Sequence, residues 1–180
     1  MNINVVMVLV LLFIWNNQTH HTPIAWQDHR PLTWEDFQSN PDRYSEAVAS
    51  TASGITFSYS LKTANNAVVA FTYEVKADFY PHKSWYISGK ENSYLLAHEQ
   101  IHFDITELHA RKLRKALSAL SVNAENNSQL KMWHGKMEKQ SEAMQQAYDE
   151  ETNHSINPLE QKRWAAFIET ELKKLDAYKI

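Results

Sequence analysis

The sequence predicts an α+β fold in which an N-terminal antiparallel hairpin or small sheet packs on three helices. Two strand-like stretches, 51–62 and 67–79, precede a long region from residue 93 to 157 that contains no proline. That region and the segment after Pro158 carry apolar residues at helical spacing. At 180 residues with 43% hydrophobic composition, the chain is long enough for one domain with a sizeable core.

The hairpin is predicted from alternation and from its turn. In the stretch 55–61, Ile-Thr-Phe-Ser-Tyr-Ser-Leu, apolar and small polar residues alternate with period two, and 67–79 is rich in Val, Phe and Tyr. Between them, Asn65-Asn66 tolerates the left-handed backbone angles of a tight turn. The two stretches are therefore expected to pair.

Helix boundaries are indicated by capping residues. Thr33 and Asp36 form a capping-box pattern that predicts a short helix ending before Pro41. The longest helix is expected from about residue 94 to 120, and a second from near Ser128 to near Thr152, where apolar residues recur every seven positions. A third helix begins with Asn157 as N-cap and runs to the C-terminus.

The predicted domain organisation is a signal peptide or N-terminal anchor at 1–16, a polar linker at 17–30 and a single domain at 31–180. The apolar run 5–15 is shorter than the roughly 20 residues that a spanning helix needs, and it fits a secretory leader better. No Lys or Arg precedes Arg30, and no A-x-A cleavage site follows, so a buried N-terminal strand is the alternative. We expect an exported protein that is periplasmic, envelope-associated or secreted, with no membrane contact beyond such an anchor.

Composition excludes several classes of function. The net charge of −3, with no long basic run, gives no electrostatic footprint for nucleic acid. The absence of cysteine excludes disulfides, thiolate zinc sites and cysteine nucleophiles. Any transition-metal site must therefore use His, Asp and Glu, and the chain contains nine histidines.

The motif His98-Glu99-Gln100-Ile101-His102 carries the predicted chemistry. On a helix, His98 and His102 lie on one face, one turn apart, and both can bind one zinc ion. Glu99 is placed to act as the catalytic base toward a water molecule. The expected fold is therefore zincin-like, with this helix as the active-site helix. The simpler alternative is a pair of partly buried histidines without a metal.

A third protein ligand must come from outside this helix. His109 lies roughly 10 Å beyond His102 along the axis, and Glu107 points to another side. The richest remaining cluster is 148–154, where His154 is a candidate ligand and Glu151 an alternative one. Asp149 could instead orient a ligand histidine, and Tyr148 is a candidate donor to a developing oxyanion.

Together these residues resemble a known family. The run 95–105 (Leu-Leu-Ala-His-Glu-Gln-Ile-His-Phe-Asp-Ile), the run 32–37 (Leu-Thr-Trp-Glu-Asp-Phe) and the late pattern Tyr148, Asp149, Thr152, His154, Gln161 and Trp164 are similar to the bacterial family described as predicted secreted zinc-dependent proteases. The resemblance covers nearly the whole chain after the leader. It implies an exported protein with a zinc peptidase site.

The resemblance also implies roles for individual residues. It favours His98, His102 and His154 as zinc ligands and Glu99 as base. Asp104, Tyr148 and Asp149 become supporting groups. One departure is that the family usually has glycine after the late histidine, where this chain has Ser155.

Three functions follow as hypotheses. The first is a zinc metallopeptidase that acts on a peptide or protein substrate. The second is a non-catalytic zinc-binding envelope module with a binding or assembly role. The third is hydrolysis of a non-peptide amide such as a cell-wall crosslink. Glu99 separates the first two, because a purely structural zinc site needs no carboxylate there.

Overall fold

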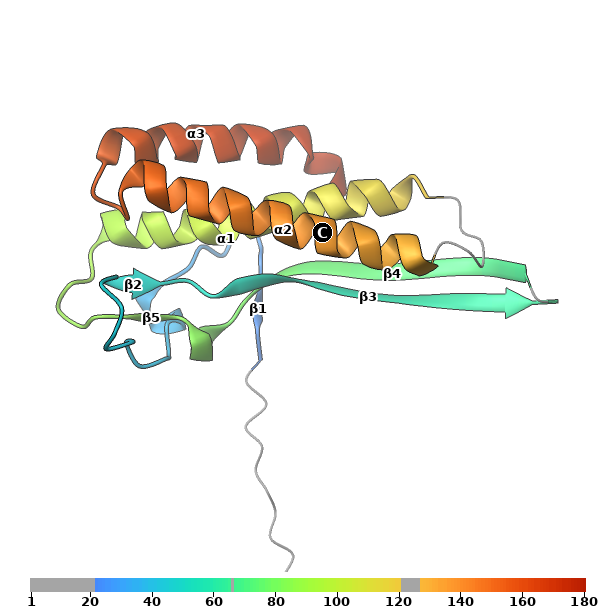
Figure 1. The fold of residues 1–180 in the computed structure, drawn as a ribbon, viewed down its shortest axis with the longest axis horizontal. Coiled ribbons are helices and arrows are strands. Elements are labelled where there is room, and N and C mark those ends of the chain that lie inside the picture. Colours follow the sequence, from blue (N-terminus) through green and yellow to red (C-terminus); the bar gives the residue numbers. More distant parts are fainter. Residues whose placement is uncertain (1–21, 66, 121–126) are drawn as a thin grey trace, which may run out of the picture.

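Three helices lie on the same side of a long antiparallel hairpin (Figure 1). The computed structural model describes residues 22–65, 67–120 and 127–180. The helices are α1 (Ser93–Ser118), α2 (Asn127–Thr152) and α3 (Pro158–Lys174). The predicted α+β architecture, with a small antiparallel sheet and three helices, is confirmed.

The hairpin consists of β3 (Ser53–Ala64) and β4 (Ala67–Phe79), which pair from Ser53 opposite Phe79 to the turn. Asn65 has a φ of 51°, as the turn prediction requires. A short strand β1 (Ile24–Ala25) pairs with the other edge of β4 and gives the order β1-β4-β3. A separate two-stranded sheet joins β2 (Ala49–Ser50) to β5 (Trp85–Tyr86).

Asparagine side chains cap the starts of α1 and α3, and the second of these caps is the predicted one. The Asn92 side chain accepts a hydrogen bond from the Leu95 amide at the start of α1, and Asn157 accepts one from Glu160 at the start of α3. The short helix predicted after Thr33 is a 3-10 turn over Trp34–Asp36 that carries the capping box. In the described part of the chain, further 3-10 turns cover Pro81–Lys83 and Asp176–Tyr178.

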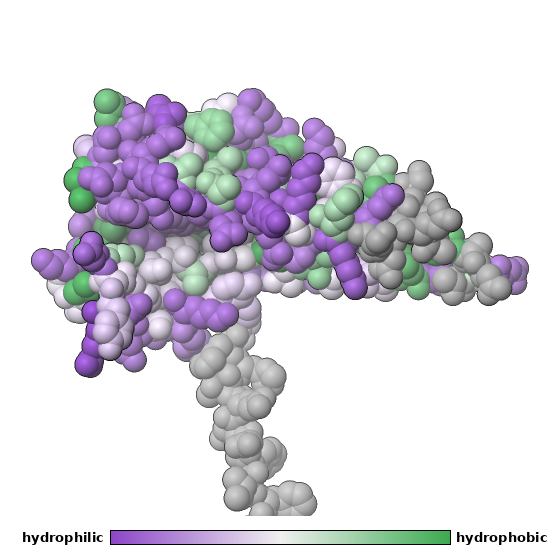
Figure 2. All heavy atoms as spheres, viewed as in Figure 1, coloured by the Kyte–Doolittle hydropathy of each residue, from purple (hydrophilic) through white to green (hydrophobic). Residues whose placement is uncertain are grey.

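Helix α1 is the central element of the fold, because apolar residues on its two sides enter two buried clusters. Phe103, Leu113 and Leu117 pack against the sheet. Ile105 and Leu108 pack against α2 and α3. The outer surfaces of α2 and α3 are predominantly hydrophilic (Figure 2). An element enclosed on both sides is a rigid platform for the motif that it carries.

The folded domain begins earlier than residue 31, which corrects the linker prediction for residues 24–26. Ile24 and Ala25 pair with the end of β4, and the buried Trp26 donates from Nε1 to Asp104 at 2.7 Å. Two-residue strands carry no periodicity, so this segment looks like a linker in the sequence. The predicted leader lies outside the described residues. Within the described ranges, no helix has the length and apolar character needed to cross a membrane.

Candidate metal centre

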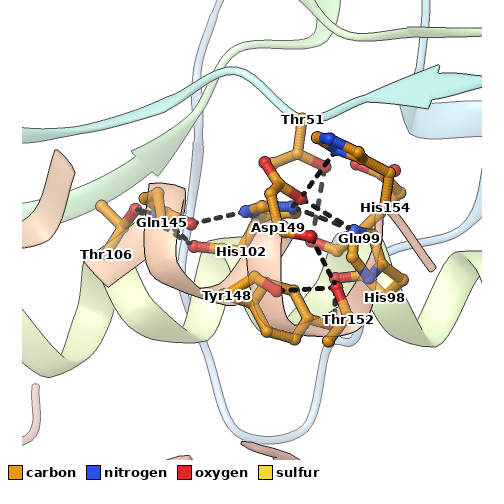
Figure 3. Close-up of polar contacts among 10 residues, drawn as sticks. All are labelled: Thr51, His98, Glu99, His102, Thr106, Gln145, Tyr148, Asp149, Thr152 and His154. Carbon is orange, nitrogen blue, oxygen red and sulfur yellow. Dashed lines mark hydrogen bonds and ion pairs between the residues drawn. The ribbon is translucent and has the colours of Figure 1, made fainter. Parts of the chain in front are cut away.

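Three ligand-type atoms converge between α1 and α2 (Figure 3). His98 and His102 project from α1, and Asp149 projects from α2. The two Nε2 atoms lie 3.2 Å apart, and Asp149 Oδ1 lies 3.2 Å from His98 Nε2 and 3.0 Å from His102 Nε2. Bonds of about 2.0 Å in a tetrahedral zinc site place ligand atoms about 3.3 Å apart. The triangle therefore has the size of a zinc site.

Gln145 fixes the orientation of the His102 ring. The Gln145 amide nitrogen donates to the His102 carbonyl at 2.8 Å and to Thr106 Oγ1 at 3.3 Å, so its oxygen faces the ring. Oε1 lies 2.5 Å from His102 Nδ1, which must therefore be the protonated nitrogen. In the neutral ring, Nε2 then presents a lone pair toward Asp149.

That arrangement requires a cation. A lone pair and a carboxylate oxygen 3.0 Å apart repel each other unless a proton or a metal ion lies between them. Burial alone would lower the pKa of His102, but the hydrogen bond with Asp149 and the charges of Glu99 and Asp149 raise it. The same histidine contacts outweigh burial at Asp149 and hold the pKa of its carboxyl well below the usual range. The donor set of two imidazoles and a carboxylate fits zinc.

Glu99 lies beside this triangle without being part of it. Its side chain is buried, and Oε2 has no hydrogen-bond partner among the described residues. Its backbone carbonyl accepts from Thr51 Oγ1 at 3.3 Å, which joins α1 to the segment before β3. A buried carboxylate without a partner is costly, so this oxygen is suited to a water molecule or a substrate proton.

Tyr148 forms the floor of the site. Its ring stacks on His98 with centroids 4.6 Å apart and packs edge-on against His102, and its side chain is fully buried. Burial raises the pKa of its hydroxyl above the usual range. The hydroxyl donates to the His98 carbonyl at 3.5 Å rather than facing solvent. In this position the Tyr148 ring supports both histidine rings.

His154 lies at the rim of the site. Its Nδ1 is 4.0 Å from Asp149 Oδ1, and its side chain is 72% exposed. Among the described residues, the group whose ligand atoms all lie within 4.8 Å of one another contains His98, His102 and Asp149. The structure therefore brings Asp149, and not His154, into the triangle.

Two other predicted residues lie elsewhere. The Glu151 side chain is half-exposed and contacts α3, where it pairs with Arg163 and accepts a hydrogen bond from Trp164 Nε1 at 2.9 Å. The structure does not bring Glu151 to the two histidines, because two positions along a helix from Asp149 turn the side chain to the opposite side. Asp104 accepts from Trp26 and from Gln100, and so ties the N-terminal segment to α1.

Sequence reasoning missed Gln145 altogether. The signal was its spacing, because Gln145 and Asp149 lie four apart on α2 and share a face. Thr152 was noted only as part of a family pattern. Its hydroxyl donates to the Tyr148 carbonyl at 2.7 Å, within the last turn of α2.

Comparison with protein-family models identifies a family for this chain. The family model described as "Bacterial protein of unknown function (DUF922)" matches residues 29–155, which include every residue of the triangle as well as Glu99 and His154. No curated protein and no solved structure matches the chain. The matched residues make up more than two thirds of the sequence, and the description of the family names no activity. The chain therefore belongs to this bacterial family of unknown function.

Proposed function

We propose that the protein is a zinc-dependent metallopeptidase of the cell envelope or the exterior, with His98, His102 and Asp149 as zinc ligands. One observation carries the proposal: Glu99, a buried carboxylate with an unpaired oxygen, lies beside a three-ligand triangle. Structural zinc sites close all four positions with protein ligands, whereas catalytic sites use three and keep one open. Partial exposure of Asp149, at 33% of its side chain, leaves this site accessible.

The residues around the metal site have separate roles in the proposed reaction. When bound, zinc lowers the pKa of a water molecule and polarises the substrate carbonyl. Glu99 accepts the proton of the attacking water on Oε2 and delivers it to the leaving amine. Gln145 holds His102 in the required tautomer, and Tyr148 keeps the His98 ring in place.

The arrangement of the active-site helix against a sheet supports a zincin-like fold and a peptide substrate. Strand β3 is the last strand of its sheet, and Thr51, just before it, contacts the backbone of Glu99. His134 of α2 lies with Nε2 2.9 Å from the Ile55 carbonyl and so occupies the β3 edge there. We therefore propose that an extended substrate pairs with the backbone of the segment before Ile55.

The test is cleavage of a library of quenched fluorogenic peptides by zinc-loaded protein beginning at residue 22. We expect cleavage by the wild type, loss after chelation with recovery on adding zinc, and a fall of at least about 100-fold in kcat for Glu99→Gln. Glu91→Gln, an exposed residue before α1, is the matched control and should leave cleavage unchanged.

Three results would count against the proposal. Equal cleavage by wild type and Glu99→Gln would remove the catalytic role of this carboxylate. Stoichiometric zinc with no cleavage of any peptide would favour the non-catalytic zinc-binding envelope module. Hydrolysis of a cell-wall amide, but not of peptides, would mean that the same metal site acts on a different class of substrate.

A further inference from the structure

The connection between α2 and α3 has an unusual backbone. Asn153, His154 and Ser155 have φ angles of 48°, 51° and 69°, so three consecutive residues other than glycine adopt left-handed conformations. Each such residue is disfavoured by roughly 1 kcal/mol or more. A connection of this kind persists only when surrounding contacts hold it.

Backbone hydrogen bonds hold it here. The His154 amide donates to the Asp149 carbonyl at 2.8 Å, and the Asn157 amide donates to the Thr152 carbonyl at 2.8 Å. The first of these bonds attaches His154 to the residue that supplies the third ligand atom. The turn therefore directs the His154 side chain back toward Asp149 (Figure 3).

The distance between the two side chains is informative. His154 Nδ1 lies 4.0 Å from Asp149 Oδ1, which is too long for a hydrogen bond. Ligand atoms of a tetrahedral zinc site lie about 3.3 Å apart, so a substrate oxygen in the open fourth position would lie at about that distance from Asp149 Oδ1. A hydrogen bond of about 2.8 Å from His154 Nδ1 to that oxygen is compatible with the separation of 4.0 Å between Nδ1 and Oδ1.

Exposure distinguishes His154 from the other candidate donor. Its side chain is 72% exposed, whereas Tyr148 is fully buried and directs its hydroxyl to the His98 carbonyl. The Tyr148 hydroxyl is thus already directed to a backbone carbonyl, whereas the His154 ring is open to solvent. Of the two, His154 is therefore the better placed to donate to a substrate oxygen.

We propose that His154 is a catalytic residue that donates a hydrogen bond from its ring to the substrate carbonyl oxygen as negative charge develops there, and that it is not a zinc ligand. The inference rests on the proposed function. Donors of this kind act on charge that appears only in the transition state, so their removal lowers kcat by about 100- to 1,000-fold and changes KM little.

The first experiment uses a metal and an oxyanion rather than an unknown substrate. The protein is loaded with Co²⁺, and inorganic phosphate is titrated while the visible absorption of the metal is recorded. His154→Ala and His154→Gln are compared with His29→Ala, which changes an exposed histidine of the N-terminal segment.

We expect Co²⁺ content and the phosphate-free spectrum to be unchanged in His154→Ala, while phosphate binds about 10-fold more weakly. His154→Gln, whose amide can donate, should recover part of that affinity, and His29→Ala should match the wild type. In peptide cleavage, the loss in His154→Ala should fall on kcat rather than on KM.

Three outcomes would overturn the proposal, each in a different way. Loss of Co²⁺ or a changed phosphate-free spectrum in His154→Ala would make His154 a ligand. Unchanged phosphate affinity and unchanged kcat would reduce it to a loop residue while leaving the proposed function intact. Absence of metal binding by the wild type would remove the proposed function together with this inference.

Discussion

At the scale of single residues, the site depends on groups that orient the ligands as much as on the ligands. Gln145 is the clearest case, since its amide contacts His102 Nδ1, the His102 carbonyl and Thr106 Oγ1. Ligand histidines ordinarily donate their second nitrogen to such a partner, which fixes the tautomer and the ring angle.

Gln145→Ala should therefore weaken zinc binding by about 10- to 100-fold while leaving the protein folded, because His102 loses the acceptor that fixes its tautomer. The measurement is competition for zinc with a chromophoric chelator. Gln146→Ala is the control, since Gln146 is exposed and bonds to Glu150 instead. Equal zinc affinity in wild type and Gln145→Ala would show that this amide does not prepare the site.

His109, on the same helix, gives a prediction about pH. It is fully buried, Nδ1 donates to the Ile105 carbonyl, and burial lowers its pKa from 6.5 to about 4. Because the unfolded state binds a proton first as the pH falls, stability from this residue is full above pH 6.5. It decreases between pH 6.5 and 4, by about 2 to 3 kcal/mol at pH 4.5.

The check is urea unfolding of metal-free wild type and His109→Gln at pH 7 and pH 4.5. The free energy of unfolding should decrease more in the wild type than in the variant, and the difference should be of the size given above. Parallel decreases in both proteins would mean that His109 does not titrate in this range and that other groups set the acid sensitivity.

At the scale of elements, the connection between α2 and α3 shows a local conflict between sequence and backbone. Ser155 has a φ of 69°, a conformation that glycine adopts without the steric penalty of a Cβ atom. The resemblance noted from the sequence places glycine at this position. A glycine there would adopt the observed backbone angle without that penalty.

Ser155→Gly should raise the free energy of unfolding by roughly 0.5 to 1 kcal/mol, because relief of left-handed strain exceeds the added entropy of the unfolded chain. Ser155→Ala keeps the Cβ atom and serves as the control, with no gain expected. Thermal unfolding of the metal-free proteins measures both. A gain of the same size in the alanine variant would mean that loss of the hydroxyl, and not relief of backbone strain, raises the free energy of unfolding.

At the scale of the whole molecule, the elements that could be predicted from the sequence are those with a local sequence signal. The N-cap Asn157 and the turn at Asn65 mark element ends with their own side chains, and the hairpin follows from alternation. The β1, β2 and β5 strands are two residues long and have no period to detect.

The candidate site divides in the same way. His98, Glu99 and His102 lie on one helix at a spacing that fixes their mutual position, so the sequence was sufficient to group them. The third member depends on how α2 is rotated against α1. Tertiary packing decides this rotation: Asp149 faces α1, Glu151 faces Arg163, and His154 lies at the rim. No local pattern contains that information.

The most direct measurement of the central claim is zinc content per chain by elemental analysis, on protein beginning at residue 22. We expect about one zinc in the wild type and in Glu99→Gln, and little in His98→Ala or Asp149→Ala. Absence of zinc from reconstituted wild type, or full retention in Asp149→Ala, would contradict the assignment of His98, His102 and Asp149 as a metal centre.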